Sequence, residues 1–207
     1  FFLALFVTMV SVIVPFSPAM PQEGLDPSWA FGMNQAESQG LVLGGILFVR
    51  FDHTRHSIQA AHTDTEGLML IGAFYIAICF SVLTFVSFRK SSWYLQIALL
   101  LFFSMTHSLD SLSFFYALMA GIYVAKSSDY GGSNINRKTS LALLFVIFSG
   151  FGFFPLIKGS MLVASILIIF FSALIFSKYR LWKPLTIVTV TPIASMFFFW
   201  ALAGRSI

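Results

Sequence analysis

Five long apolar runs constrain the fold of this chain more than any other feature of its sequence. They cover residues 1–17, 67–88, 139–157, 160–176 and 184–204. A transmembrane helix needs about 20 mostly apolar residues, because the hydrocarbon core of a bilayer is about 30 Å thick and each helical residue adds about 1.5 Å. Lipid offers no water to the backbone, so each run must pair its amide groups within a helix. The runs predict an all-α fold, a polytopic transmembrane helix bundle.

Two shorter apolar runs, residues 93–106 and 111–125, lie between the second and third long runs. Each covers only about 22 Å as a helix, so the pair forms either two short spans or a re-entrant hairpin. We therefore expect about seven membrane segments in a single transmembrane domain over residues 1–207. Only 10% of the residues are charged, against about 25% in soluble domains, which excludes a soluble fold. The chain opens without an initiator methionine and stops just after an apolar run, and we interpret it as a fragment.

The basic residues orient the bundle, because Lys and Arg concentrate in the cytoplasmic loops of membrane proteins. With a cytoplasmic N-terminus, eight of the 12 basic residues lie inside: Arg89, Lys90, Lys126, Arg137, Lys138, Lys178, Arg180 and Lys183. All four histidines and every acid except Asp129 then lie outside. The sequence thus predicts a multi-pass protein of the inner (plasma) membrane with membrane lipid as a partner. Nucleic acid is excluded as a partner, because the basic residues flank apolar runs in small groups.

The first outer loop, residues 18–66, is far longer than a connector and carries most of the acids. Asp26 followed by Pro27 is typical of a helix start, since the carboxylate accepts free backbone N–H groups and proline fits the first helical position. Trp29 and Met33 follow at helical spacing, with amide side chains on other faces. We expect a short amphipathic helix on the outer membrane surface, with Trp29 at the headgroup level.

The stretch GLDPSWAFGMNQAESQG, residues 24–40, resembles a family of bacterial multi-pass membrane proteins that are similar to lipid-linked-sugar glycosyltransferases of the GT-C fold. The resemblance covers roughly residues 10–125 and is most specific at Leu25, Asp26, Pro27, Ser28, Trp29, Asn34 and Gln35. It implies that Asp26 acts as a catalytic base or holds a divalent metal. It also implies a polyprenyl-phosphate sugar donor whose lipid lies between helices.

Each of these residues also has a plain structural interpretation. Asp26 fits a helix cap and nothing more, although a cap can also be a catalytic acid. Trp29 fits an interfacial anchor, and Asn34 and Gln35 fit solvated amides rather than groups that contact a sugar or a headgroup.

Two functions stay open. One is a glycosyltransferase, or a degenerate relative of one, that acts on lipid-linked sugars at the outer face. The other is a non-catalytic carrier or scaffold for lipid-linked material. A carrier favours charges or broken helices at the bilayer midplane, and the five long runs hold no charged residue. The sequence therefore favours chemistry at the outer face.

Residues 46–66 depart from the family pattern, which resumes at about residue 67. We interpret this patch as a local shift of reading frame or as a diverged, non-functional copy. Taken as it stands, it holds metal-ligand residue types: Asp52, His53, His56, His62, Asp64 and Glu66. Their spacing matches no established site, and Arg50 and Arg55 add repelling charge, so we favour a solvated loop and predict no metal site.

Four smaller patterns predict structure rather than chemistry. The turn residue Asp110 is expected to cap the second short run, and residues 127–138 predict a flexible inner connector. Threonines before Pro192 are typical of a proline kink whose hydroxyls bond backward along the helix. The cluster Ser149, Gly150 and Gly152 indicates a close contact between helices. The single cysteine, which lies in an apolar run, excludes an internal disulfide.

Overall fold

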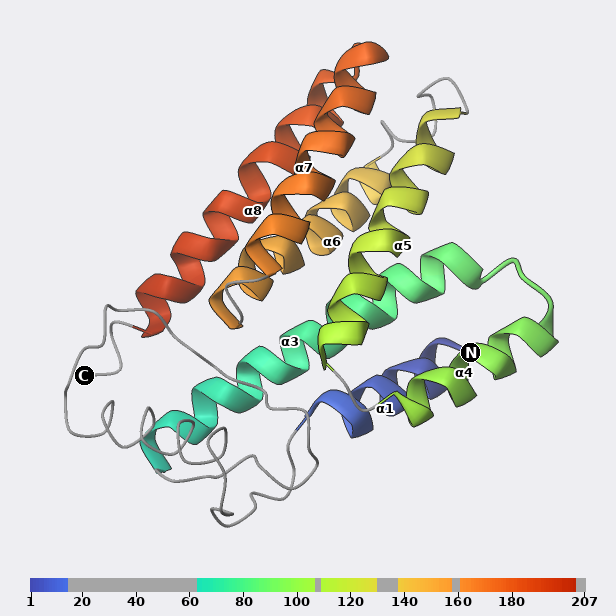
Figure 1. The fold of residues 1–207 in the computed structure, drawn as a ribbon, viewed down its shortest axis with the longest axis vertical. Coiled ribbons are helices and arrows are strands. Elements are labelled where there is room, and N and C mark those ends of the chain that lie inside the picture. Colours follow the sequence, from blue (N-terminus) through green and yellow to red (C-terminus); the bar gives the residue numbers. More distant parts are fainter. Residues whose placement is uncertain (15–62, 107–108, 130–137, 158–160, 204–207) are drawn as a thin grey trace.

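A computed structural model of the protein describes residues 1–14, 63–106, 109–129, 138–157 and 161–203 (Figure 1). Every regular element within these ranges is an α-helix. The helices are α1 (Phe2–Ile13), α3 (Thr63–Phe88), α4 (Trp93–Met105), α5 (Leu109–Asp129), α6 (Lys138–Ile157), α7 (Met161–Lys178) and α8 (Trp182–Ala203). The predicted all-α helix bundle is confirmed.

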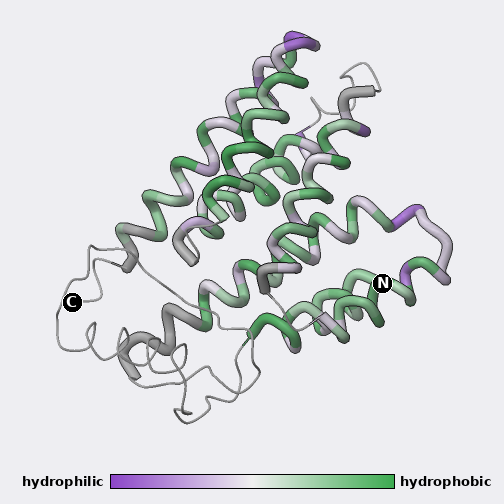
Figure 2. Tube along the Cα trace, in the orientation of Figure 1, coloured by the Kyte–Doolittle hydropathy of each residue, from purple (hydrophilic) through white to green (hydrophobic). Residues whose placement is uncertain are grey.

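The lengths of the helices suit a membrane. Four of them, α3, α6, α7 and α8, are long and apolar enough to cross a bilayer, and α1 and α4 are apolar but shorter. Hydrophobic residues run along the helices, while hydrophilic residues gather near their ends (Figure 2). The described helices are therefore those of a multi-pass membrane protein, in which each span satisfies its own backbone hydrogen bonds.

The two helices predicted to be short differ in length. Helix α4 has 13 residues and covers about 20 Å, close to the prediction. Helix α5 has 21 residues and covers about 32 Å, because it continues through Lys126 to Asp129. The prediction that a connector begins at residue 127 is therefore wrong by three residues. Ser127 is accommodated in the helix because its Oγ donates to the carbonyl oxygen of Tyr123 at 2.7 Å.

The helices form two packed groups. Helix α1 packs against α3 and α4, while α6, α7 and α8 pack against one another (Figure 1). Helix α5 joins the groups by contacting both α3 and α7, and α6 joins them by contacting α3. Consecutive helices reverse direction, so their termini meet at two ends of the bundle. We name these the basic end, which carries the α3–α4 and α7–α8 turns, and the acidic end, which carries the starts of α3 and α5.

The α7–α8 turn reverses the chain through a Schellman-type hydrogen-bond pattern. The N–H of Leu181 donates to the carbonyl oxygen of Phe176 at 2.9 Å, and the N–H of Arg180 donates to that of Ser177 at 3.0 Å. Arg180 takes the left-handed conformation that this pattern requires, with φ of 53°, although glycine is the usual residue there. The turn therefore keeps a positive charge at the basic end at the expense of backbone strain.

The close helix contact predicted from the small residues of α6 is confirmed. A Cβ atom on Gly152 would overlap with Ser195 Oγ and with the carbonyl oxygen of Pro192, both on α8. The two helices are also joined by a hydrogen bond in which Ser195 Oγ donates to the carbonyl oxygen of Ser149 at 2.7 Å. Small residues and hydroxyls are what allow helices to associate in lipid, where burial of apolar surface gives no driving force.

The predicted back-bonding of threonines on α8 is also confirmed. Thr186 Oγ1 donates to the carbonyl oxygen of Trp182, and Thr189 Oγ1 donates to that of Leu185, both at 2.9 Å. Pro192 lies inside the helix just beyond them and cannot supply a backbone donor to the turn before it. Hydroxyls that bond to the helix itself leave no unpaired polar group on a surface that faces lipid.

Aromatic residues fill the interior between α3, α5 and α6. Tyr116 is fully buried, and its hydroxyl donates to the carbonyl oxygen of Ile147 at 2.7 Å. Its ring lies 4.8 Å from that of Phe80 and 5.2 Å from that of Phe154, measured between centroids. Gly150 leaves room for the hydroxyl, because a Cβ there would stand 3.0 Å from it. Helices α3, α5 and α6 are thus held in a defined mutual position.

Replacing Gly152 with alanine should destabilise the protein by about 1–3 kcal/mol, because the added methyl group forces α6 and α8 apart. The matched control is Gly121→Ala in α5, where the new Cβ would meet Ile168 at an ordinary 3.5 Å. Thermal unfolding of the two variants in detergent measures the difference. Equal unfolding midpoints would contradict the close contact between α6 and α8.

Candidate functional site

The residues predicted from the sequence to form the site lie outside the described residues. These are Asp26, Trp29, Asn34 and Gln35, together with the histidines of residues 46–66. Asp110 is the second residue of α5 and so belongs to its first turn. The position of its side chain lies outside the described part of the structure. The helices on either side of residues 15–62 are described: α1 ends and α3 begins at the acidic end of the bundle (Figure 1).

Charge is strongly segregated between the two ends of the described bundle. Seven basic residues lie at the basic end: Arg89, Lys90, Lys126, Lys138, Lys178, Arg180 and Lys183. The first turns of α3 and α5, at the acidic end, contain Asp64, Glu66 and Asp110. Asp129, the last residue of α5, is the single acid at the basic end of the described chain. The fold therefore brings the basic residues of four separate chain segments to one end.

Exposed aromatic residues mark the same end. Trp93 and Tyr94 begin α4, and their rings lie with centroids 3.7 Å apart at an interplanar angle of 31°. Tyr179 and Trp182 flank the α7–α8 turn and are also exposed. Tryptophan and tyrosine gather where membrane and water meet, because their rings are apolar and their N–H or O–H groups are polar. Exposed rings of this kind are typical of the headgroup level of a bilayer.

A network of hydrogen bonds holds the α3–α4 turn. The backbone N–H of Arg89 donates to the carbonyl oxygen of Phe85 at 2.8 Å, and that of Ser91 donates to Phe88 at 2.9 Å. Gln96 Nε2 of α4 then reaches back to the carbonyl oxygens of Phe88 and Ser91, at 3.3 Å and 3.2 Å. These bonds satisfy carbonyl groups left free at the end of α3 and give the turn a defined shape.

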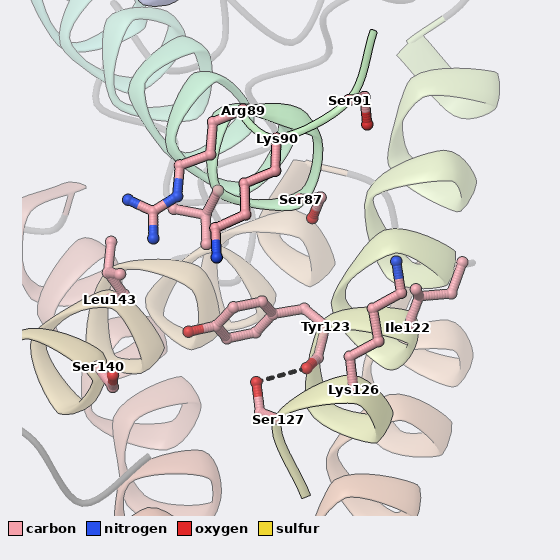
Figure 3. A pocket seen from close by; sticks show the side chains of 11 residues that line it. Ser87, Arg89, Lys90, Ser91, Ile122, Tyr123, Lys126, Ser127, Ser140 and Leu143 are labelled. Atoms are coloured by element: carbon pink, nitrogen blue, oxygen red, sulfur yellow. Dashed lines mark hydrogen bonds between the residues drawn. The ribbon is translucent and has the colours of Figure 1, made fainter. Parts of the chain in front are cut away.

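An open pocket of about 400 Å³ lies beside this turn, between the ends of α3 and α5 and the start of α6 (Figure 3). Three basic residues line it: Arg89, Lys90 and Lys126. Five hydroxyl side chains line it as well: Ser87, Ser91, Tyr123, Ser127 and Ser140. No carboxylate occurs among the described residues that form the lining. The pocket is therefore positively charged and rich in hydrogen-bond donors.

The basic side chains reach the pocket from two chain segments (Figure 3). Lys90 extends from the α3–α4 turn toward the ring of Tyr123, while the guanidinium group of Arg89 lies on the side of the pocket away from Lys126. Lys126 extends from α5 toward the α3–α4 turn on the other side of that ring. Within the described residues, Ser87 Oγ is buried and has no hydrogen-bond partner. Three exposed cations therefore border the pocket.

These groups suit the binding of an anion. Ammonium and guanidinium groups form short, charge-assisted hydrogen bonds with phosphate oxygens, and hydroxyls add neutral donors. The pocket offers no carboxylate to act as a base, and the described residues contain no group of three His, Cys, Asp or Glu side chains that could hold a metal. The geometry of the pocket therefore supports recognition of an anion.

From the sequence, Arg89, Lys90 and Lys126 are predicted only to orient the bundle. Their position around one pocket depends on how α3 packs against α5, which no local spacing reveals. Comparisons with protein-family models, with curated proteins and with solved structures gave no match.

Cysteines introduced at the two ends of the bundle should react with a membrane-impermeant thiol reagent from opposite faces of a sealed vesicle. We expect Ser92→Cys and Lys183→Cys, exposed at the basic end, to share one face. Ser111→Cys, exposed in the first turn of α5, should react from the other face. The wild-type protein is the unlabelled control, because its Cys79 is fully buried. Reaction of all three variants from one face would contradict the two-ended arrangement.

Proposed function

We propose that this chain is a membrane glycosyltransferase similar to those of the GT-C fold, or a degenerate relative of one, acting on polyprenyl-phosphate sugars. The reaction takes place at the outer face of a bacterial inner membrane, and the N-terminus is cytoplasmic. The observation that carries the proposal is the segregation of charge in the bundle. Basic residues concentrate on the cytoplasmic side of membrane proteins, so the acidic end faces outward.

The connection of residues 15–62 supports Asp26 as the catalytic residue. Helix α1 ends and α3 begins at the acidic end, so the segment that contains Asp26 leaves and rejoins the bundle on the proposed outer side. An ionised carboxylate accepts the proton of an acceptor hydroxyl as that group attacks the sugar. In this proposal, Trp29, Asn34 and Gln35 of the same segment contact the sugar or a lipid headgroup. Among the described residues, no group of three His, Cys, Asp or Glu side chains could hold a divalent metal.

The composition of the described interior supports outer-face chemistry over transport through the bundle. Apart from Tyr116 and Cys79, its buried polar residues are serines and threonines: Ser81, Thr84, Ser113, Ser149, Ser165, Ser172 and Thr191. Ionisable residues at membrane depth mark ion and substrate pathways in carriers. Charged residues in the four candidate spans fall only at their ends, within the first or last turn. A carrier or scaffold for lipid-linked material is the alternative function.

Asp26→Asn should reduce the release of polyprenyl phosphate from a lipid-linked sugar by about 10²–10⁴-fold, because the amide cannot accept the proton. Asparagine caps helices about as well as aspartate, so this substitution separates catalysis from capping. The purified full-length protein is assayed, with thermal unfolding as the check on folding. Asp129→Asn at the basic end is the matched control and should keep wild-type turnover. Equal turnover by Asp26→Asn and wild type would remove Asp26 from catalysis, and no turnover by either would favour the carrier or scaffold.

A further inference from the structure

We propose that the basic pocket between α3, α5 and α6 binds the phosphate headgroup of an anionic phospholipid, whose acyl chain lies along α5. The pocket is at the opposite end of the bundle from the helix ends that flank the Asp26 segment. It is therefore a site distinct from the proposed catalytic one, and it does not depend on that function. It binds a structural or regulatory lipid rather than a substrate.

The positive charge of the pocket favours the binding of an anion. Arg89, Lys90 and Lys126 line the same open pocket as exposed side chains, so the pocket attracts anions. Asp129 lies one turn beyond Lys126 and, within the described chain, supplies one negative charge at this end against seven positive ones. A phosphate diester brings a negative charge and several acceptor oxygens to the three cationic donors that line the pocket.

An apolar stripe leads from the pocket along α5. Phe114, Leu118 and Ile122 are 56%, 61% and 39% exposed, and they follow one another at the four-residue spacing that aligns side chains on a helix face. Lys126 is the next residue on this face and lies in the pocket, as does Ile122. From Phe114 to Lys126 the helix rises about 18 Å, close to the half-thickness of about 15 Å of the hydrocarbon core. The stripe is thus long enough for one acyl chain.

The depth of the pocket in the membrane agrees with a lipid headgroup. The exposed rings of Trp93 and Tyr94 begin α4, immediately after the turn that carries Arg89 and Lys90. Such rings lie at the headgroup level of a bilayer. Basic pockets between transmembrane helices on the cytoplasmic side are a physical means of holding anionic headgroups. A volume of about 400 Å³ accommodates a phosphate with its glycerol group.

Two features distinguish this ligand from other sources of phosphate. A free phosphate ion has no acyl chain and gains nothing from the stripe on α5. A zwitterionic phospholipid has an acyl chain, but it also carries an ammonium group that the three cations repel. An anionic phospholipid satisfies both the charge of the pocket and the apolar surface beneath it.

Native mass spectrometry of the purified full-length protein tests the proposal, with phosphatidylglycerol and phosphatidylcholine of matched acyl chains as probes. We expect phosphatidylglycerol to bind at least about tenfold more tightly. The triple variant Arg89→Gln, Lys90→Gln, Lys126→Gln should lose this preference, since each basic residue near an anionic lipid contributes about fivefold to binding. Leu118→Ser should weaken the binding of phosphatidylglycerol without changing the charge.

The matched control is Lys138→Gln, Lys178→Gln, Lys183→Gln, which removes the same charge from the same end but outside the pocket. It should keep the preference for phosphatidylglycerol over phosphatidylcholine. An equal loss of this preference in both triple variants would show that the basic end attracts anionic lipid without a specific site, and would overturn the proposal. Displacement of phosphatidylglycerol by millimolar inorganic phosphate would identify a free anion as the ligand and overturn it too. If the pocket triple variant does not fold, Lys126→Gln should lower the affinity for phosphatidylglycerol about fivefold, and Lys126→Arg should keep the wild-type affinity. Equal affinities of these two single variants would overturn the proposal.

Discussion

The close approach of α6 to α8 is the interaction on which the rest of the bundle depends. In lipid, helices gain little from burying apolar surface, so contact must come from backbones that fit closely and from hydrogen bonds between them. Gly152 allows the fit, and the bond from Ser195 to Ser149 adds a polar link. Because α6 also packs against α3 and lines the basic pocket through Ser140, its position against α8 is transmitted to the pocket.

The two ends of the bundle carry opposite charge because the chain reverses after every helix. Every second reversal lies at the basic end, and two of the turns there are held by hydrogen bonds of Gln96 after α3 and by the left-handed Arg180 after α7. Because the α3–α4 turn has a defined shape, Arg89 and Lys90 occupy fixed positions in the lining of the pocket. The helix ends that flank residues 15–62 lie at the opposite end of the bundle from this pocket.

The sequence predicted the spans well because their length is dictated by bilayer thickness, a constraint that acts on each run separately. It also predicted the contact at Gly152 and the backward bonds of Thr186, since small residues and hydroxyls have few other uses in lipid. The pocket was missed because Lys126 meets the end of α3 only through tertiary packing. The end of α5 was missed because serines favour connectors unless, like Ser127, they bond back to the helix. Asp26 stays a prediction.

The shortness of α4 has a consequence for the surrounding bilayer. Its 13 residues cover about 20 Å of a hydrocarbon layer about 30 Å thick, and much of its surface is exposed and apolar. At its C-terminal end, Ser104 and Thr106 donate to the helix's own carbonyl groups, so both hydroxyls are satisfied without water. A span this short is accommodated by local thinning of the bilayer or by flanking residues that reach the interface, whereas a re-entrant helix requires neither.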